Sequence, residues 1–239
     1  MKKIIIAVSA ALTLLLIAAL LFFRNTEFAY SGAVEAVEID ISPKLSDTIT
    51  KFYVKEGDKI SKGQTLFVLE GKEILAAFDF ANKEFERTSQ LYGKNVVSKE
   101  IYDAQKYKYD AASIKKEYLA LKSPIDGKVL YKYYNEGEMA AAGRKVLTVA
   151  DLKEMDVWVY LPHDMIAFLN VGDKVTGFLP EADKEFAGHI YIINDEAEFT
   201  PKNVQTRKER QRLVYGVKLR FANDENLTLK PGMTLEVKF

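Results

Sequence analysis

Two distant segments of the chain carry the same pattern, and this internal repeat limits the possible folds more than any other feature. The first segment is ISPKLSDTITKFYVKEGDKISKGQTLFVLE, residues 41–70, and the second is KSPIDGKVLYKYYNEGEMAAAGRKVLTVAD, residues 122–151. The matching positions are Ser42-Pro43 and Ser123-Pro124, Glu56-Gly57 and Glu136-Gly137, and Gly63 and Gly143. Each copy reads as a short strand, a turn that needs glycine and a second apolar strand. Because neither copy can bury its apolar face alone, we expect the two to pack as one small β-sandwich.

The segment between the copies has a helical period. From Lys72 the apolar residues recur every three or four positions, which predicts two helices. On the first helix they are Ile74, Phe78, Ala81, Phe85, Thr88 and Leu91 or Tyr92, and on the second Ile101, Ala104, Tyr107, Ala111, Ile114 and Tyr118. Gly93 is placed to end the first helix as a C′ residue, and Ser98 to cap the second. The pattern therefore predicts an antiparallel, coiled-coil-like hairpin of roughly 30 Å.

Beyond Asp151 the chain returns to a β pattern. Strands are predicted at residues 155–161, 174–179, 186–194, 213–221 and 233–239, with a short helical turn near 164–169. The sequence LKPGM, residues 229–233, predicts a turn into the last strand. About five short strands with turn signals favour a small closed barrel.

The N-terminus has the pattern of a membrane anchor. Lys2 and Lys3 precede an uninterrupted run of apolar and weakly polar residues from Ile4 to Phe23, and Arg24 follows it. About 20 helical residues span one bilayer core. The run is longer than the apolar part of most signal peptides, so we expect an uncleaved anchor, with a cleaved signal as the alternative. The leading lysines favour a cytoplasmic N-terminus, which places the bulk of the chain outside the cytoplasmic membrane.

The pattern V-x-E-G-D-x-I-x-x-G-Q-x-L in the first copy resembles the half-motif of the biotinyl/lipoyl carrier domain. Split by a helical hairpin, the repeat resembles the HlyD-type membrane fusion proteins, the periplasmic adaptors of efflux and secretion pumps, and in appearance the YbhG-like adaptors of ABC exporters. The resemblance implies a mainly β fold with a helical hairpin. Its expected parts are an anchor (1–24), the first half of a lipoyl-like domain with a lead-in strand (25–71), the hairpin (72–120), the second half (121–151) and a β-barrel (152–239).

Composition argues against several other functions. Acidic and basic residues balance at 34 each, so no net field favours nucleic acid, and the absence of cysteine excludes disulfides and thiol catalysis. His163 and His189 lie in unrelated patterns, so no metal site is predicted. Clustered acids near Asp195 are expected in a solvated loop. We therefore expect no catalytic residues, no cofactor and no enzyme activity.

Two candidate contact sites follow from the resemblance. Arg87, Leu91 and Ser98 have the spacing R-x3-L-x6-S, which is similar to the motif by which such adaptors contact a TolC-like outer-membrane channel. Plain structural roles also fit, because Arg87 can pair with Glu84 and Ser98 can cap a helix. The second site is the basic segment TPKNVQTRKER, which resembles a loop of adaptors that serve ABC exporters. Its candidate transporter contacts are Lys202, Arg207, Lys208 and Arg210.

The sequence therefore predicts a single-pass inner-membrane adaptor with its bulk in the periplasm, and the resemblance implies a homo-oligomeric ring. It would link an inner-membrane transporter, with an ABC permease and ATPase favoured, to a TolC-like channel. An adaptor of an RND or major-facilitator pump is the alternative. Two more distant alternatives are a lipoyl or biotinyl carrier modified at Lys72, where a helical insert replaces the required β-turn, and a surface-anchored protein without a channel partner.

Overall fold

The computed structural model describes residues 30–199 and 213–239. The described chain forms two compact units. Of the described residues, the barrel unit takes 30–35, 156–199, 213–222 and Pro231–Phe239, and the sandwich unit comprises Ala36–Met155 and Asn223–Lys230. The predicted anchor, residues 1–24, lies outside the described residues. Within 30–199 and 213–239, each helix is too short or too polar to cross a membrane.

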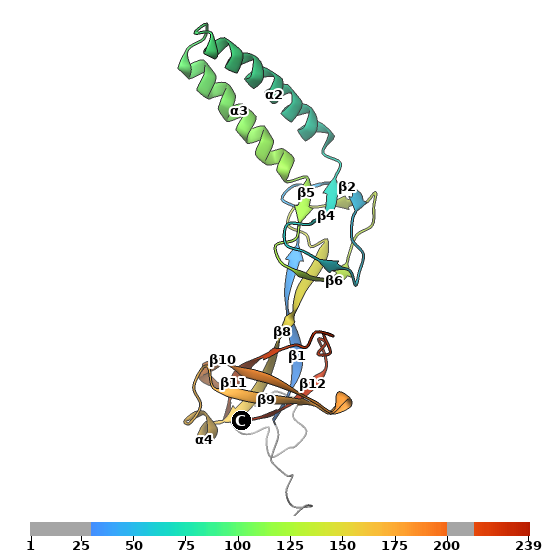
Figure 1. Ribbon diagram of the computed structural model, residues 1–239, viewed down its shortest axis with the longest axis vertical. Helices are drawn as coiled ribbons and strands as arrows, with labels where there is room; N and C mark the ends of the chain where they lie inside the picture. The colour runs from blue at the N-terminus through green and yellow to red at the C-terminus, as the bar shows by residue number, and fades with distance from the viewer. Residues whose placement is uncertain (1–29, 200–212) are drawn as a thin grey trace, which may run out of the picture. The chain divides into compact units, whose positions relative to one another are not determined.

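The sandwich unit is built from both copies of the repeat. One sheet has the order β5 (Ala120–Lys122), β4 (Thr65–Leu69), β2 (Asp47–Phe52) and β7 (Met139–Ala140). Opposite it, β3 (Lys59–Ile60) pairs with β6 (Gly127–Lys132), and β6 pairs with the first part of β8 (Leu147–Pro162). Ile49, Phe67, Val129 and Val149 are fully buried in a common core. The strands of this unit are shown in Figure 1.

Reciprocal hydrogen bonds confirm that the two copies interlock. In each copy, the glutamate of the Glu-Gly pair accepts a backbone N–H from the other copy, and the following glycine donates its N–H to the other copy. The bonds are Phe52 N to Glu136 Oε1 (2.8 Å), Lys132 N to Glu56 Oε1 (2.7 Å), Gly57 N to Val129 O (2.9 Å) and Gly137 N to Ile49 O (2.8 Å). Each copy completes the turn of its partner, so neither half is a folding unit alone.

The structure corrects one part of the predicted repeat alignment. Gly63 donates its N–H to the carbonyl oxygen of Ser123 (2.8 Å), and Gly143 donates its N–H to that of Pro43 (2.9 Å). Ser123 is therefore the equivalent of Pro43, and the predicted match of the two Ser-Pro pairs is wrong by one residue. Identical letters suggested the match, but backbone pairing sets the register.

The helices α2 (Lys72–Gly93) and α3 (Lys99–Glu117) pack along each other as a hairpin, visible beside β4 and β5 in Figure 1. The predicted inner face of α2 is confirmed, because Thr88 is buried and the ring of Phe85 lies 5.6 Å from Tyr102 and 5.1 Å from Tyr109. The predicted inner face of α3 is wrong: its three large members Ile101 (48%), Tyr107 (75%) and Ile114 (49%) are exposed, and so is Ala104. Helix α3 has two apolar stripes, and aromatic stacking selects the one with Tyr102 and Tyr109.

Helix α2 ends differently from the prediction. Gly93 is its last helical residue rather than the C′ residue, and the left-handed position is Asn95 (φ 57°). Val96 donates its N–H to Leu91 O (2.9 Å), and Asn95 donates its N–H to Tyr92 O (2.9 Å). These two bonds define a Schellman motif, and asparagine tolerates the left-handed conformation at C′.

The barrel unit contains a closed six-stranded β-barrel. The strand order is β1 (Tyr30–Ile41), β12 (Thr234–Lys238), β9 (Lys174–Leu179), β10 (Lys184–Phe199), β11 (Leu213–Ala222) and β8, and a β1–β8 pairing closes it. A Cβ on Gly32 would lie 2.1 Å from Trp158 O, so closure needs glycine there. The lead-in strand, predicted to belong with the sandwich, thus contributes its first residues to the barrel.

The acidic cluster is the other difference in this unit. Asp195, Glu196 and Glu198 were expected in a loop, but they lie within β10 beside a register shift between Ile193 and Ala197. The acids are exposed, which explains why the segment reads as a loop. Within residues 30–199 and 213–239, no group of three metal-ligating side chains is present, and His163 and His189 lie in α4 (His163–Ile166) and β10.

Candidate functional site

The candidate channel-contact residues all lie near the free end of the hairpin. Arg87 and Leu91 are one turn apart on α2, so they share one face of the helix. Arg87 forms an ion pair with Glu84, and its side chain is 67% exposed. Ser98 caps α3, and its Oγ accepts the Ile101 N–H at 3.3 Å. Leu91 is half-buried, and its carbonyl oxygen accepts the Schellman hydrogen bond.

The structure adds two exposed apolar side chains to this region. Val96, in the connection between the helices, is 66% exposed, and Ile101, in the first turn of α3, is 48% exposed. Lys94 and Lys99 flank the connection and are also exposed. Sequence reasoning assigned Ile101 to the helix interface and did not select Val96. The available signal was the apolar pair Val96-Val97 in a connection of a few residues, where polar residues are usual. The hairpin tip, defined here as residues 87–101, therefore offers apolar and cationic groups together.

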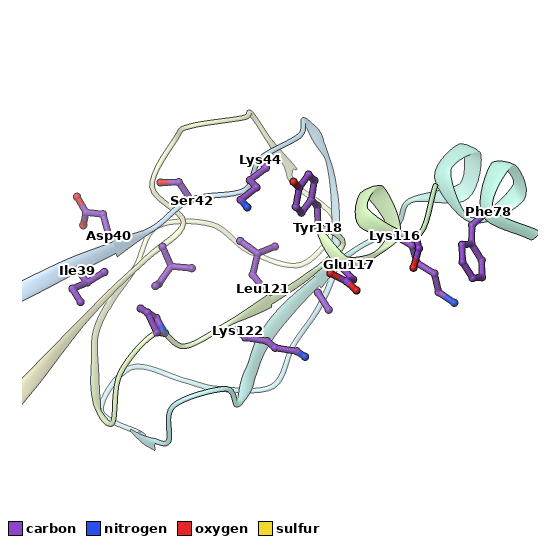
Figure 2. Close-up of a pocket in the computed structure, with 14 residues that line it drawn as sticks. Ile39, Asp40, Ser42, Lys44, Phe78, Lys116, Glu117, Tyr118, Leu121 and Lys122 are labelled. Carbon is purple, nitrogen blue, oxygen red and sulfur yellow. The ribbon is translucent and has the colours of Figure 1, made fainter. Parts of the chain in front are cut away.

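A cleft of about 800 Å³ lies at the base of the hairpin, within the sandwich unit. Figure 2 shows Lys44 beside Tyr118, and Lys116 near Phe78. The Lys44 Nζ lies 4.3 Å from the centre of the Tyr118 ring, and the Lys116 Nζ lies 3.9 Å from that of Phe78. Such cation–π contacts contribute about 0.5–1 kcal/mol each at exposed sites. The first joins the end of α3 to the sandwich, and the second joins the two helices, so the cleft lining fastens the hairpin base.

Lys72, the candidate carrier lysine, is the first residue of α2. It forms an ion pair with Glu70, whose hydrogen bond and negative charge raise the pKa of the lysine. Gly71 has φ 60° and donates its N–H to Asp47 Oδ2 at 2.9 Å. The lysine thus starts a helix rather than occupying an exposed β-turn, which argues against a carrier role.

A buried ion cluster joins strands β8 and β11 of the barrel. Asp156 is 2% exposed, and its carboxylate accepts two hydrogen bonds from Arg220 (2.8 and 3.1 Å) and lies 3.0 Å from the Lys218 Nζ. Burial by itself raises the pKa of Asp156, but the hydrogen bonds and charges of Arg220 and Lys218 outweigh it, so the pKa is lowered. The cluster joins the two strands, because Lys218 and Arg220 of β11 both contact the carboxylate of Asp156 on β8. The basic candidates Lys202, Arg207, Lys208 and Arg210 lie between β10 and β11, outside the described residues.

The described chain is thus a split sandwich with an inserted hairpin, followed by a closed barrel. Residues 37–151 match the family model of the CzcB-like, barrel-sandwich hybrid domain. The predicted resemblance to the HlyD-type membrane fusion proteins is therefore confirmed for this segment of the chain. The prediction that it is not an enzyme agrees with this resemblance.

Individual relatives show similarity over parts of the chain. The YbhG protein of Salmonella gallinarum, a UPF0194 membrane protein, is 30% identical over 118 residues, which cover 49% of this chain and 35% of that protein. The alignment thus spans about a third of the relative's length. A MacA–MexA chimera with the Pseudomonas aeruginosa MexA α-hairpin domain shares the fold, with a TM-score of 0.69, 23% identity, and coverage of 87% of this chain and 78% of the chimera. The membrane fusion protein Spr0693 of Streptococcus pneumoniae R6 has a TM-score of 0.66 and 20% identity, with 89% and 98% coverage.

Proposed function

We propose that the chain is a membrane-anchored periplasmic adaptor that joins an inner-membrane ABC exporter to a TolC-like outer-membrane channel. One observation carries the proposal: the two repeat copies interlock into a platform from which a hairpin of 22-residue and 19-residue helices projects. The proposed role is mechanical, because the exposed groups at the hairpin tip suit protein contact rather than chemistry. Coiled-coil packing of α2 and α3 is part of this proposal.

The size of the hairpin tip supports assembly of several copies. Arg87, Val96 and Ile101 together offer much less surface than the roughly 800 Å² per partner of a stable interface. Several copies that engage one channel together would gain affinity through multivalency. A homo-oligomeric ring would place several hairpin tips at one channel mouth, so we include it in the proposal.

The ABC exporter is the favoured transporter because the basic segment at residues 200–210 resembles the loop of ABC-linked adaptors. A cationic segment could meet acidic periplasmic loops of a permease. Affinity purification through a C-terminal tag should recover an ABC permease and its ATPase. Recovery of an RND or major-facilitator pump without ABC subunits would contradict the transporter class and leave the adaptor role intact.

Substitutions at the hairpin tip test the channel contact. Val96→Asp and Arg87→Glu should abolish crosslinking to the channel and reduce export, because burying an unpaired charge costs several kcal/mol. Both side chains are exposed, so the melting temperature should stay unchanged. Lys72→Glu is the matched control: its side chain is 79% exposed and paired with an acid, but it lies at the other end of α2.

Three outcomes separate the alternatives. Unchanged crosslinking and export in both tip variants would remove the channel contact and favour a surface-anchored protein without a channel partner. A loss of export in Lys72→Glu, with an intact mass above that of the encoded chain in the wild type, would indicate a carrier. Leu91→Asp should lower the melting temperature as well as export, because Leu91 is half-buried and belongs to the helix-ending motif.

A further inference from the structure

The turn after α4 in the barrel unit displays two large apolar side chains. Phe168 is 83% exposed, more than any other large apolar side chain in the described chain, and Val171 is 64% exposed. They are three positions apart in the short connection between α4 and β9. Exposed apolar side chains that lie together are candidates for a contact surface, and this pair is therefore the starting point.

Hydrogen bonds hold this turn in a defined conformation. Gly172 has φ 97° and donates its N–H to Ile190 O (2.8 Å), and Ile190 donates its N–H to Asp173 O (2.9 Å). The carboxylate of Asp173 also accepts the Asn170 N–H at 2.7 Å. The turn is therefore bonded to β10, and Phe168 and Val171 are displayed by a built structure rather than by a loose loop.

The turn lies at the end of the barrel where the N-terminal segment enters. The Tyr30 hydroxyl donates to the Met165 Sδ of α4 (3.0 Å), and the Tyr30 ring lies 6.1 Å from that of Phe239. Arg24 closes the apolar segment of residues 4–23, and the few residues between Arg24 and Tyr30 reach at most about 20 Å. If residues 4–23 cross the membrane, this end of the barrel lies close to its surface.

We propose that the turn Ala167–Gly172 inserts Phe168 and Val171 into the outer boundary of the lipid bilayer. The inference rests on the proposed membrane anchor. Two apolar side chains are too little for a stable protein interface, but they suit a bilayer boundary, where each buried apolar group contributes independently. Tyr30, at the same end of the barrel, is of a residue type enriched at membrane–water interfaces, and the neighbouring apolar ring of Phe239 is 40% exposed.

The charges around the turn determine the kind of lipid. Asp164 and Asp173 offset Lys174 and His163, so the turn has no basic excess that would select anionic headgroups. The insertion should therefore be apolar in origin and should occur equally in zwitterionic and anionic bilayers. This property separates it from a polybasic contact, which would depend on anionic lipid.

The absence of cysteine allows a direct test on the full chain. The Val171→Cys variant, labelled with an environment-sensitive dye, would be reconstituted into phosphatidylcholine vesicles with brominated acyl chains. The matched control is Ala182→Cys, exposed in the turn between β9 and β10 at the opposite end of the barrel. Quenching at position 171 should be at least threefold stronger than at 182, and Phe168→Ser added to Val171→Cys should at least halve it.

The possible outcomes distinguish the lipid contact of the turn from the proposed membrane anchor. Equal quenching at 171 and 182, in protein that alkaline carbonate leaves in the vesicles, would overturn the inference and leave the proposed adaptor intact. Release by carbonate would overturn the anchor and the inference with it. Quenching at 171 that appears only when several chains share a vesicle would identify a second copy as the partner and overturn the lipid contact. Emission from Trp158, the sole tryptophan, confirms that each variant is folded.

Discussion

Asp156 of the barrel unit should be the most sensitive charged residue in the described chain. Its carboxylate is 2% exposed and neutralises Lys218 and Arg220, whose side chains are 22% and 20% exposed. Asp156→Asn keeps the shape but removes the buried negative charge that Lys218 and Arg220 share. Breaking a buried ion pair costs about 3–5 kcal/mol. Because the amide oxygen retains one hydrogen bond, we expect a loss of about 3 kcal/mol, which lowers the melting temperature of a unit of this size by about 12–24 °C.

The sole tryptophan provides the assay. Trp158 lies in β8, two residues after Asp156, and the Lys218 Nζ is 5.6 Å from its ring, so its fluorescence reports on the barrel unit. Thermal unfolding of the full chain would be followed at this residue for Asp156→Asn and for the control Asp164→Asn. The control changes an exposed carboxylate and should stay within about 0.5 kcal/mol of wild type. The double variant Asp156→Asn/Lys218→Met should recover part of the loss, because it also removes one uncompensated cation.

The pH dependence follows from the lowered pKa of Asp156. A carboxyl whose folded-state pKa lies below its usual value of 3.8 adds stability above that value and loses it as pH falls through the folded-state pKa. The difference in the free energy of unfolding between wild type and Asp156→Asn should be fully present at neutral pH and should become smaller as the pH falls below about 4. A variant as stable as Asp164→Asn at neutral pH, or a gap that persists unchanged into strong acid, would refute this reasoning.

Two further predictions concern the sandwich unit. Gly71→Ala should destabilise it by about 1–3 kcal/mol, because the residue has φ 60° and its Cβ would lie 2.2 Å from Leu119 Cδ1. The control Gly63→Ala, with φ 83° and open space around it, should cost only the smaller backbone strain. Urea unfolding that ranks the two variants in the reverse order would contradict the packing argument. Glu56→Ala and Glu136→Ala should each lower the free energy of unfolding by about 0.5–1.5 kcal/mol, and by similar amounts, because each removes the equivalent hydrogen bond between the copies. Clearly unequal losses in the same urea assay would show that the two halves are not energetically equivalent.

The hairpin shows where periodicity stops being informative. The face of α2 was predicted correctly because it has one strong apolar stripe, with Phe78 and Phe85 on it. Helix α3 has tyrosines on two sides, and tyrosine is compatible with both a packed and an exposed position. Only the position of Phe85 between Tyr102 and Tyr109 selects the inner face. Spacing along the sequence was enough to locate the candidate contact residues at the hairpin tip. The exposure of Val96 was not predicted, because it depends on how the connection between the helices folds.

The sequence by itself determined that two repeat copies must pack together, that a hairpin separates them and that a β-barrel follows, because apolar period and glycine positions are local properties. Tertiary structure alone decided three other features. The equivalence of Ser123 with Pro43 comes from backbone pairing, and the closure of the barrel by β1 depends on the close approach of Gly32 to Trp158. The ion cluster at Asp156 brings together charges from β8 and β11, which are far apart in the chain. Register, closure and charge pairing depend on contacts between distant segments, and no local pattern encodes which segments meet.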